Sequence, residues 1–284
     1  MSTPPPHRRI LIAGPTTALV RAAGAAGFRV WSLCDARRCP PEELTALSER
    51  VLVADFGDEA ALKEALDTAA AVGLHVNPPG TVRLLADHEA VRRLVHDNQL
   101  CPPEAAEDAA GDRYRVDTLS VHGMHHTVGI TAETPWGLLH PAPLAGDTAA
   151  TLRSVVTSLL DLAGYQYGPA HTEVVLTPDG PVTTGCAAVV AEEPVPWLVR
   201  VASGRELVAD AFEVLAGQDV APVRALRFAA SVTLPEIRPD DVRALPYVRQ
   251  VVRSDGERGG QVVLEAESPE HAAELASRMK RLFV

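Results

Sequence analysis

Three side chains in the stretch from residue 171 to residue 186 carry groups that could do acid–base or nucleophilic chemistry. His171 and Glu173 stand two residues apart in a segment, His171–Leu176, that is typical of a strand. Side chains at i and i+2 of a strand point to one face, so an imidazole and a carboxylate would look into one cleft. Cys186 belongs to the next predicted strand and would lie across the hairpin, near that face. We therefore take His171, Glu173 and Cys186 as candidate catalytic residues.

Each candidate also has a plainer interpretation. His171 could act as acid or base, with Glu173 as its partner or as an anchor for a substrate amine, but the two could equally form a structural ion pair. Cys186 would be a nucleophile only if its pKa were lowered, and a buried, inert thiol is the simpler interpretation. The sequence keeps these alternatives open.

The other histidines of this region do not follow a metal-ligand pattern. His125 and His126 are adjacent, and neighbouring residues of a strand point to opposite faces, so we expect a solvated hairpin pair. His122 and His140 are expected to be neutral imidazoles satisfied by backbone groups. The four cysteines show no C-x-x-C spacing. We accordingly predict no metal site, no structural zinc and no disulfide.

Composition narrows the class of protein. The 284 residues suffice for two or three compact units, and 46 % hydrophobic with 22 % charged residues is ordinary for a globular chain. A formal net charge of −11 disfavours a nucleic-acid partner, whose phosphates need a basic stripe. No apolar run approaches the roughly 20 residues of a membrane span, and Met1–Arg9 has no apolar signal-peptide core. We expect a cytoplasmic protein without a membrane partner.

The elements that would position these side chains fall into successive units. Residues 1–78 alternate strands (9–13, 28–33, 51–54 and 73–76) with helices, which predicts a parallel sheet covered on both faces. Only Gly14 lies in the first strand-to-helix turn, so the dinucleotide-binding fingerprint is missing. Residues 79–113 predict two helices, 81–86 and 87–98, followed by a linker.

The second half of the chain has the pattern of antiparallel strands joined by tight turns. Residues 114–220 predict a hairpin (115–122 and 125–131), a helix over 147–164, the hairpin that carries His171, and one helix over 196–217. Residues 221–284 predict strands at 225–232, 248–253 and 261–265, and a last helix for which Ser268 and Pro269 fit the N-cap and first positions. The fold class is therefore α/β, with a small α+β unit at the C-terminus.

Several segments, in this order, resemble the ATP-grasp superfamily, and most closely its L-amino acid ligase type of carboxylate-amine ligase. The matching stretches are Asn77–His88, Asp117–Thr131, His140–Leu144, Gly168–Glu173 and the tail from Arg224 onward. The resemblance implies a pre-ATP-grasp parallel domain (1–78), a helical segment and linker (79–113), a reduced ATP-grasp lobe (114–220) and a C-terminal subdomain (221–284).

The chain departs from this family where ATP should bind. The resemblance implies a lobe, whose lysines meet the phosphates, at the place that residues 103–115 occupy here. Lys63 and Lys280 are the only lysines, neither in a comparable context, and His88 stands where the family usually has lysine. A triphosphate needs fixed cations or backbone N–H groups, so we expect poor ATP binding.

The metal-binding strand departs as well. Glu173 matches the family's first Mg²⁺ ligand, but Thr184 replaces the second glutamate, Cys186 the asparagine, and Ala188 the arginine that would meet a substrate carboxylate. Mg²⁺ requires several oxygen ligands in near-octahedral geometry, and one carboxylate does not supply them. We predict no cofactor; ATP and Mg²⁺ are expected only for a working ligase.

Three hypotheses about function follow. The first is a truncated, degenerate ligase-like protein without ATP or Mg²⁺ binding. It would be a partner or substrate-binding subunit in amino-acid-derived small-molecule biosynthesis, as a homo-oligomer or beside an intact ligase. The second is an ATP-independent enzyme that acts on an amino-acid-like molecule through His171 and Glu173. The third is an ATP-dependent carboxylate-amine ligase. The sequence leaves open whether the protein is an enzyme.

Overall fold

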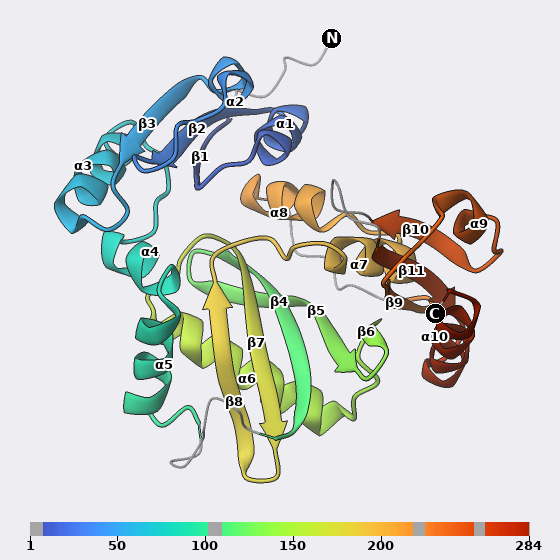
Figure 1. The fold of residues 1–284 in the computed structure, drawn as a ribbon. Helices are drawn as coiled ribbons and strands as arrows, with labels where there is room; N and C mark the ends of the chain where they lie inside the picture. Colours follow the sequence, from blue (N-terminus) through green and yellow to red (C-terminus); the bar gives the residue numbers. More distant parts are fainter. Residues whose placement is uncertain (1–7, 102–109, 218–224, 253–258, 284) are drawn as a thin grey trace.

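The computed structural model describes residues 8–101, 110–217, 225–252 and 259–283, and it has two sheets with helices around them (Figure 1). Three parallel strands form the small sheet in the order β1-β2-β3. Eight antiparallel strands form the large sheet in the order β10-β11-β9-β6-β5-β4-β7-β8. The α/β class predicted from the sequence is confirmed.

The N-terminal unit alternates strands and helices as predicted. Its elements are β1 (Arg8–Ala13), α1 (Thr17–Ala25), β2 (Phe28–Asp35), α2 (Glu42–Leu47), β3 (Arg50–Ala54) and α3 (Glu59–Ala70). Asp58 caps α3, because its carboxylate accepts the N–H groups of Ala60 and Ala61. Apolar residues of α1 and α2 pack on one face of the sheet and those of α3 on the other.

The fourth strand predicted over residues 73–76 does not form. This segment is held from outside the sheet, because the Asn77 side chain donates to the Tyr167 carbonyl and accepts the N–H groups of Gln166 and Tyr167. His75 stacks on the Tyr167 ring at 4.8 Å between centroids. The chain then enters α4 (Pro79–Leu85) and α5 (His88–Asp97), close to their predicted bounds. Most of the predicted linker, residues 102–109, lies outside the described residues.

One continuous sheet joins the strands of the second half. Its strands are β4 (Asp112–Val121), β5 (Met124–Thr134), β6 (Gly137–His140), β7 (Gly168–Thr177), β8 (Gly180–Ala187), β9 (Phe228–Leu234), β10 (Val248–Val252) and β11 (Gly260–Ala266). The short strand β6 pairs with β5 on one side and with β9 on the other. The strands predicted for 114–220 and those predicted for 221–284 therefore share one ladder of hydrogen bonds.

The helices cover different parts of this sheet. α6 (Gly146–Leu162) runs behind β4, β7 and β8 (Figure 1) and buries Leu152, Leu159 and Leu160 completely. On the opposite side, α7 (Val195–Ser203) and α8 (Leu207–Leu215) form a core with Leu138 of β6. The structure breaks the single helix predicted over 196–217 at Gly204, whose φ of 75° is the left-handed conformation that ends helices.

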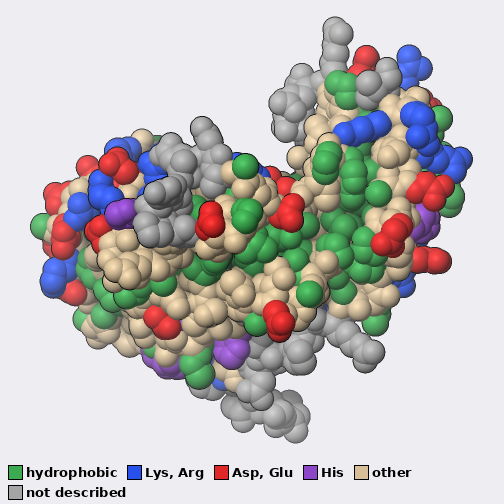
Figure 2. Space-filling view, turned by 90° about the horizontal axis from the view of Figure 1, so that it is seen from below, with side chains coloured by type: hydrophobic (Ala, Val, Ile, Leu, Met, Phe, Trp, Pro, Cys, Tyr) green, Lys and Arg blue, Asp and Glu red, His purple; other side chains and the backbone are tan. Residues whose placement is uncertain are grey.

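The last two helices pack beside the C-terminal strands of the large sheet. α10 (Pro269–Phe283) begins as predicted, since the Ser268 hydroxyl accepts the N–H of His271, and it packs on β9 and β11. α9 (Pro239–Arg243) is a short helix beside β10. On the face in Figure 2, acidic and basic side chains intermingle toward the two ends, and hydrophobic side chains gather between them. None of the described helices is long and apolar enough to cross a membrane.

Candidate functional site

An aspartate and a histidine meet on the side of the large sheet that faces away from α6. His171 Nδ1 lies 2.7 Å from Asp117 Oδ1, and the two side chains are 15 % and 5 % exposed. The residues are direct cross-strand partners on β7 and β4, so their side chains share a face. In the neutral imidazole this hydrogen bond makes Nδ1 the donor and leaves the lone pair on Nε2, which can then accept a proton.

The residues around this pair form what we call the polar face. Their neighbours along the strands, such as Val116 and Val174, belong to the core under α6, and strand alternation therefore turns these residues the other way. The polar face consists of Arg115, Asp117, Gly129, Thr131, His140, His171 and Glu173.

His140 is the buried histidine of the polar face. Its Nδ1 lies 3.0 Å from the Thr131 hydroxyl. Burial lowers the pKa of His140 to about 4, although the negative charge of Asp117 opposes this shift. The ring is therefore neutral near pH 7, as predicted, but its partner is a side-chain hydroxyl and not the expected backbone group.

A β-bulge brings a glycine opposite the aspartate. Counted from the β4–β5 turn, where Val121 pairs with Met124, Asp117 would face Val128; the extra residue in β5 shifts the register, and Asp117 pairs with Gly129. A Cβ on Gly129 would lie 3.8 Å from Asp117 Oδ2 and 3.1 Å from His140 Cε1. Asp117 Oδ2 is buried and accepts no hydrogen bond from the described residues.

Glu173 lies one step further along the same face. It is exposed, sits across from Arg115, and makes no ion pair within the part of the chain that the structure describes. Arg115 instead pairs with Glu133, Nη2 to Oε1, at 2.8 Å. A Cβ on Gly185 of β8 would contact both Glu173 Oε2, at 3.8 Å, and His88 Nδ1, at 3.3 Å. His88 therefore lies beside Glu173.

Cys186 is separated from the other two candidates by a second bulge. From the β7–β8 turn, where Thr177 pairs with Gly180, Cys186 would have faced His171; the extra residue Thr184 pairs it with Thr172 instead. The thiol therefore points into the core under α6 and accepts the Thr172 hydroxyl at 3.3 Å. Burial raises the pKa of Cys186 to about 11. The expectation that Cys186 lies near the face of His171 and Glu173 is wrong.

The histidines of the β4–β5 hairpin also differ from expectation. His125 is not solvated: its side chain is 1 % exposed, its Nδ1 lies 2.7 Å from the Ser120 hydroxyl, and its Nε2 lies 3.3 Å from Asp161 of α6. Burial lowers the pKa of His125. His122 is held by a side chain and not by a backbone group, since its Nδ1 lies 2.8 Å from the Tyr167 hydroxyl. The His125 ring therefore joins β5 to β4 through Ser120, and the His122 ring joins the β4–β5 turn to Tyr167.

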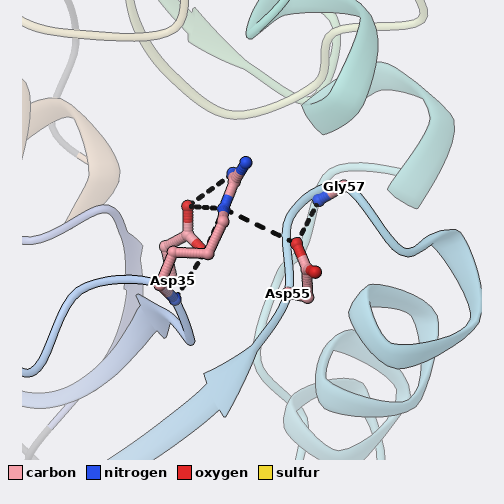
Figure 3. Close-up of polar contacts among 4 residues, drawn as sticks. Asp35, Asp55 and Gly57 are labelled. Carbon is pink, nitrogen blue, oxygen red and sulfur yellow. Dashed lines mark hydrogen bonds and ion pairs between the residues drawn. The ribbon is translucent and has the colours of Figure 1, made fainter.

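A second polar cluster lies at the carboxyl ends of β2 and β3 (Figure 3). The Arg37 guanidinium binds the Asp35 carboxylate, with Nη2 at 2.7 Å from Oδ2, and its Nε lies 3.7 Å from Asp55 Oδ1. Asp55 Oδ1 also accepts the N–H of Gly57 at 2.8 Å. Hydrogen bonds from Arg37 hold the pKa of Asp35 down to about 2. These groups satisfy one another, so the cluster joins the two strand ends.

The structure thus brings together residues that sequence patterns had left apart. His171 and Glu173 share a face, and Asp117, Arg115 and Gly129 join them, although none of the last three was singled out. The signal for Asp117 was a charged residue in the middle of a strand whose neighbours are buried. No group of three or more His, Cys, Asp or Glu that could hold a metal ion occurs among the described residues.

The fold has relatives among solved structures. The L-amino acid ligase from Bacillus licheniformis superimposes with a TM-score of 0.70 at 16 % identity, over 97 % of this chain and 97 % of that chain. The glycinamide-RNase-transformylase T of Mycobacterium tuberculosis gives 0.69 at 14 % identity, over 98 % and 100 %. The N5-carboxyaminoimidazole ribonucleotide synthetase of Thermotoga maritima gives 0.66 at 14 % identity, over 97 % and 98 %.

No family model matches the chain, and no curated protein is significantly similar to it in sequence. At identities this low, superposition speaks for the fold and not for the reaction. The agreement nevertheless extends over almost the whole of this chain and of each of the three structures. The chain has an ATP-grasp-related fold, which it shares with these structures.

Proposed function

We propose that this chain is a ligase-like protein that binds a small amino-acid-like molecule on the polar face and does not use ATP or Mg²⁺. It would serve as the substrate-binding or partner subunit of an enzyme for amino-acid-derived small molecules. The observation that carries the proposal is the chemistry of the polar face, which offers hydrogen-bond acceptors and negative charge where a nucleotide would need cations.

The donor set around Glu173 supports the absence of a magnesium site. Its cross-strand partner is Gly185, which has no side chain, and the next residue, Cys186, points into the opposite core. Thr184 uses its hydroxyl to bond the Glu173 carbonyl at 3.4 Å. Mg²⁺ binds several oxygens in near-octahedral geometry, and the described residues here present one carboxylate. They do not fit the ion.

The balance of charge around the polar face likewise supports the absence of a nucleotide-binding site. On the polar face, Asp117 and Glu173 supply carboxylates, whereas the guanidinium of Arg115 is already paired with Glu133. The two lysines of the chain are engaged elsewhere: Lys63 pairs with Asp67 on α3, and Lys280 on α10 reaches the Pro135 carbonyl. A polyphosphate brought to such a surface would be repelled and not clamped.

A thermal-shift and calorimetry panel tests the proposal. We expect at least one standard L-amino acid or dipeptide to stabilise the protein, since a ligand at 100 times its Kd adds about 2.7 kcal/mol to the free energy of unfolding. Mg-ATP and Mg-ADP at the same concentration should leave the melting temperature unchanged. Tight binding of either nucleotide by the chain alone would contradict the proposal, and so would a panel in which no amino acid or dipeptide binds.

The Asp117–His171 pair supports a second candidate function, acid–base catalysis without ATP. A buried carboxylate that accepts the Nδ1–H of an imidazole fixes its tautomer and leaves Nε2 free to take a proton. In such a role His171 would remove the proton from the carbon next to the carboxylate of a bound amino acid and return it. Asp117 would position His171.

Exchange in D₂O tests this second function. Wild-type protein should catalyse deuterium incorporation at the α-carbon of an amino acid that binds, as followed by proton NMR. His171→Ala should lower the exchange rate by about 100-fold or more, the usual size of a general-base effect. Asp117→Asn should lower the rate while circular dichroism shows that the fold is kept, which separates a positioning role from a loss of fold. An equal exchange rate in wild type and His171→Ala would rule out the role.

A further inference from the structure

We infer that the ligand places a primary ammonium group against the backbone of Gly129, between Asp117 Oδ2 and the His140 ring. We call this position the ammonium seat. The inference rests on the proposed function and names the part of the ligand that the polar face recognises. It makes Gly129 the residue that determines specificity and Asp117 the residue that binds the ligand's charge.

The unpartnered oxygen of Asp117 supports the first step. The side chain is 5 % exposed, its Oδ1 is engaged by His171, and its Oδ2 accepts no hydrogen bond from the described residues. A buried carboxylate oxygen without a donor costs free energy, and a ligand that brings a donor recovers it. The missing partner must therefore be a hydrogen-bond donor.

The glycine supports the second step. Gly129 does not have a positive φ, so its backbone conformation does not require glycine. A strand glycine often marks a place where a ligand comes close to the backbone. The β5 bulge sets this bare position opposite Asp117, and a side chain there would enter the space within 3.8 Å of Oδ2 and 3.1 Å of His140 Cε1. A methyl group there would press on the His140 ring and crowd the approach to Oδ2.

The charges on the polar face favour an ammonium group as the donor to Asp117 Oδ2. His140 is neutral near pH 7 because burial lowers its pKa, and Arg115 is paired with Glu133, so neither competes for the Asp117 carboxylate. Glu173 adds a second, exposed carboxylate two residues beyond His171 on the same face. An ammonium is attracted by both carboxylates, whereas a neutral hydroxyl gains less and a carboxylate or phosphate is repelled.

Calorimetry with matched ligands tests the seat. The probes are the standard L-amino acids, their N,N-dimethyl derivatives, and the corresponding carboxylic acids that lack the amine. Wild-type protein should bind the primary amine about tenfold or more tighter than either counterpart, the size expected for a hydrogen bond to a charged group. Gly129→Ala and Asp117→Asn should reduce this preference to about twofold or less, mainly by weakening binding of the primary amine.

Controls separate this inference from the proposed function. Gly24→Ala makes the same chemical change in a helix where a Cβ meets nothing within 4 Å, and it should leave the preference unchanged. Asp117→Asn keeps the side-chain volume, so a loss of preference there cannot come from crowding against His140. Amino acids that bind wild type and both variants with the same preference would overturn the ammonium seat while leaving the proposed function intact. Wild-type protein that binds no amino acid would overturn both.

Discussion

Replacing Leu159 with alanine should lower the free energy of unfolding by about 3–5 kcal/mol, the range for a large apolar side chain removed from a packed core. Leu159 is 0 % exposed and lies in the core between α6 and the large sheet. The cost combines lost burial with the cavity left behind, because the surrounding strands hold their places. Urea denaturation followed by circular dichroism measures it.

The matched control lies on the same helix. Leu162 is 45 % exposed, so Leu162→Ala should change the free energy of unfolding by less than about 1 kcal/mol. Equal destabilisation by both variants would mean that α6 does not bury the face described for it. A stable Leu159→Ala protein would point the same way.

Lowering the pH from 6.5 to about 4 should destabilise the protein through His140. Its pKa falls from the ordinary 6.5 to about 4 because burial disfavours the charged ring. In this window the unfolded chain binds a proton at residue 140 that the folded chain does not, so stability falls as pH falls. The contribution is absent above pH 6.5 and grows to about 3 kcal/mol near pH 4, at 1.36 kcal/mol for each unit of pKa.

His140→Asn isolates the contribution of His140 to the pH dependence of stability. Asparagine keeps an amide near the position of Nδ1, where it can bond the Thr131 hydroxyl, but it does not titrate. The variant should show a shallower fall of stability between pH 6.5 and 4 than wild type. His125, whose pKa burial also lowers, stays in both proteins and cancels in the difference. Parallel pH profiles would contradict the buried, neutral state of His140.

The polar face lies on an ATP-grasp-related framework. Across the three structural relatives, identity with this chain stays at 14 to 16 %, while superposition covers nearly the full length. Such a relation preserves the framework and leaves the side chains on it free to change. A carboxylate with an unpartnered oxygen beside a glycine suits an amine better than a polyphosphate.

The sequence by itself determined much of the local structure. Alternating strands and helices predicted the parallel N-terminal sheet, and Ser268 and Pro269 marked the start of a helix that forms where predicted. The spacing of His171 and Glu173 placed them on one face. These predictions succeed because strand periodicity and helix-capping hydrogen bonds involve residues only a few positions apart. They therefore depend on the local sequence alone.

Only the tertiary structure decided which of these side chains meet. Asp117 and His171 are 54 residues apart, and their contact exists because β4 pairs with β7, a choice made by the packing of the whole sheet on α6. The bulges at Val128 and Thr184 are single extra residues, yet each reverses every side chain beyond it. One bulge turns Gly129 toward Asp117, and the other turns Cys186 away from His171. A strand pattern has the same period with or without a bulge, so the sequence could not locate them.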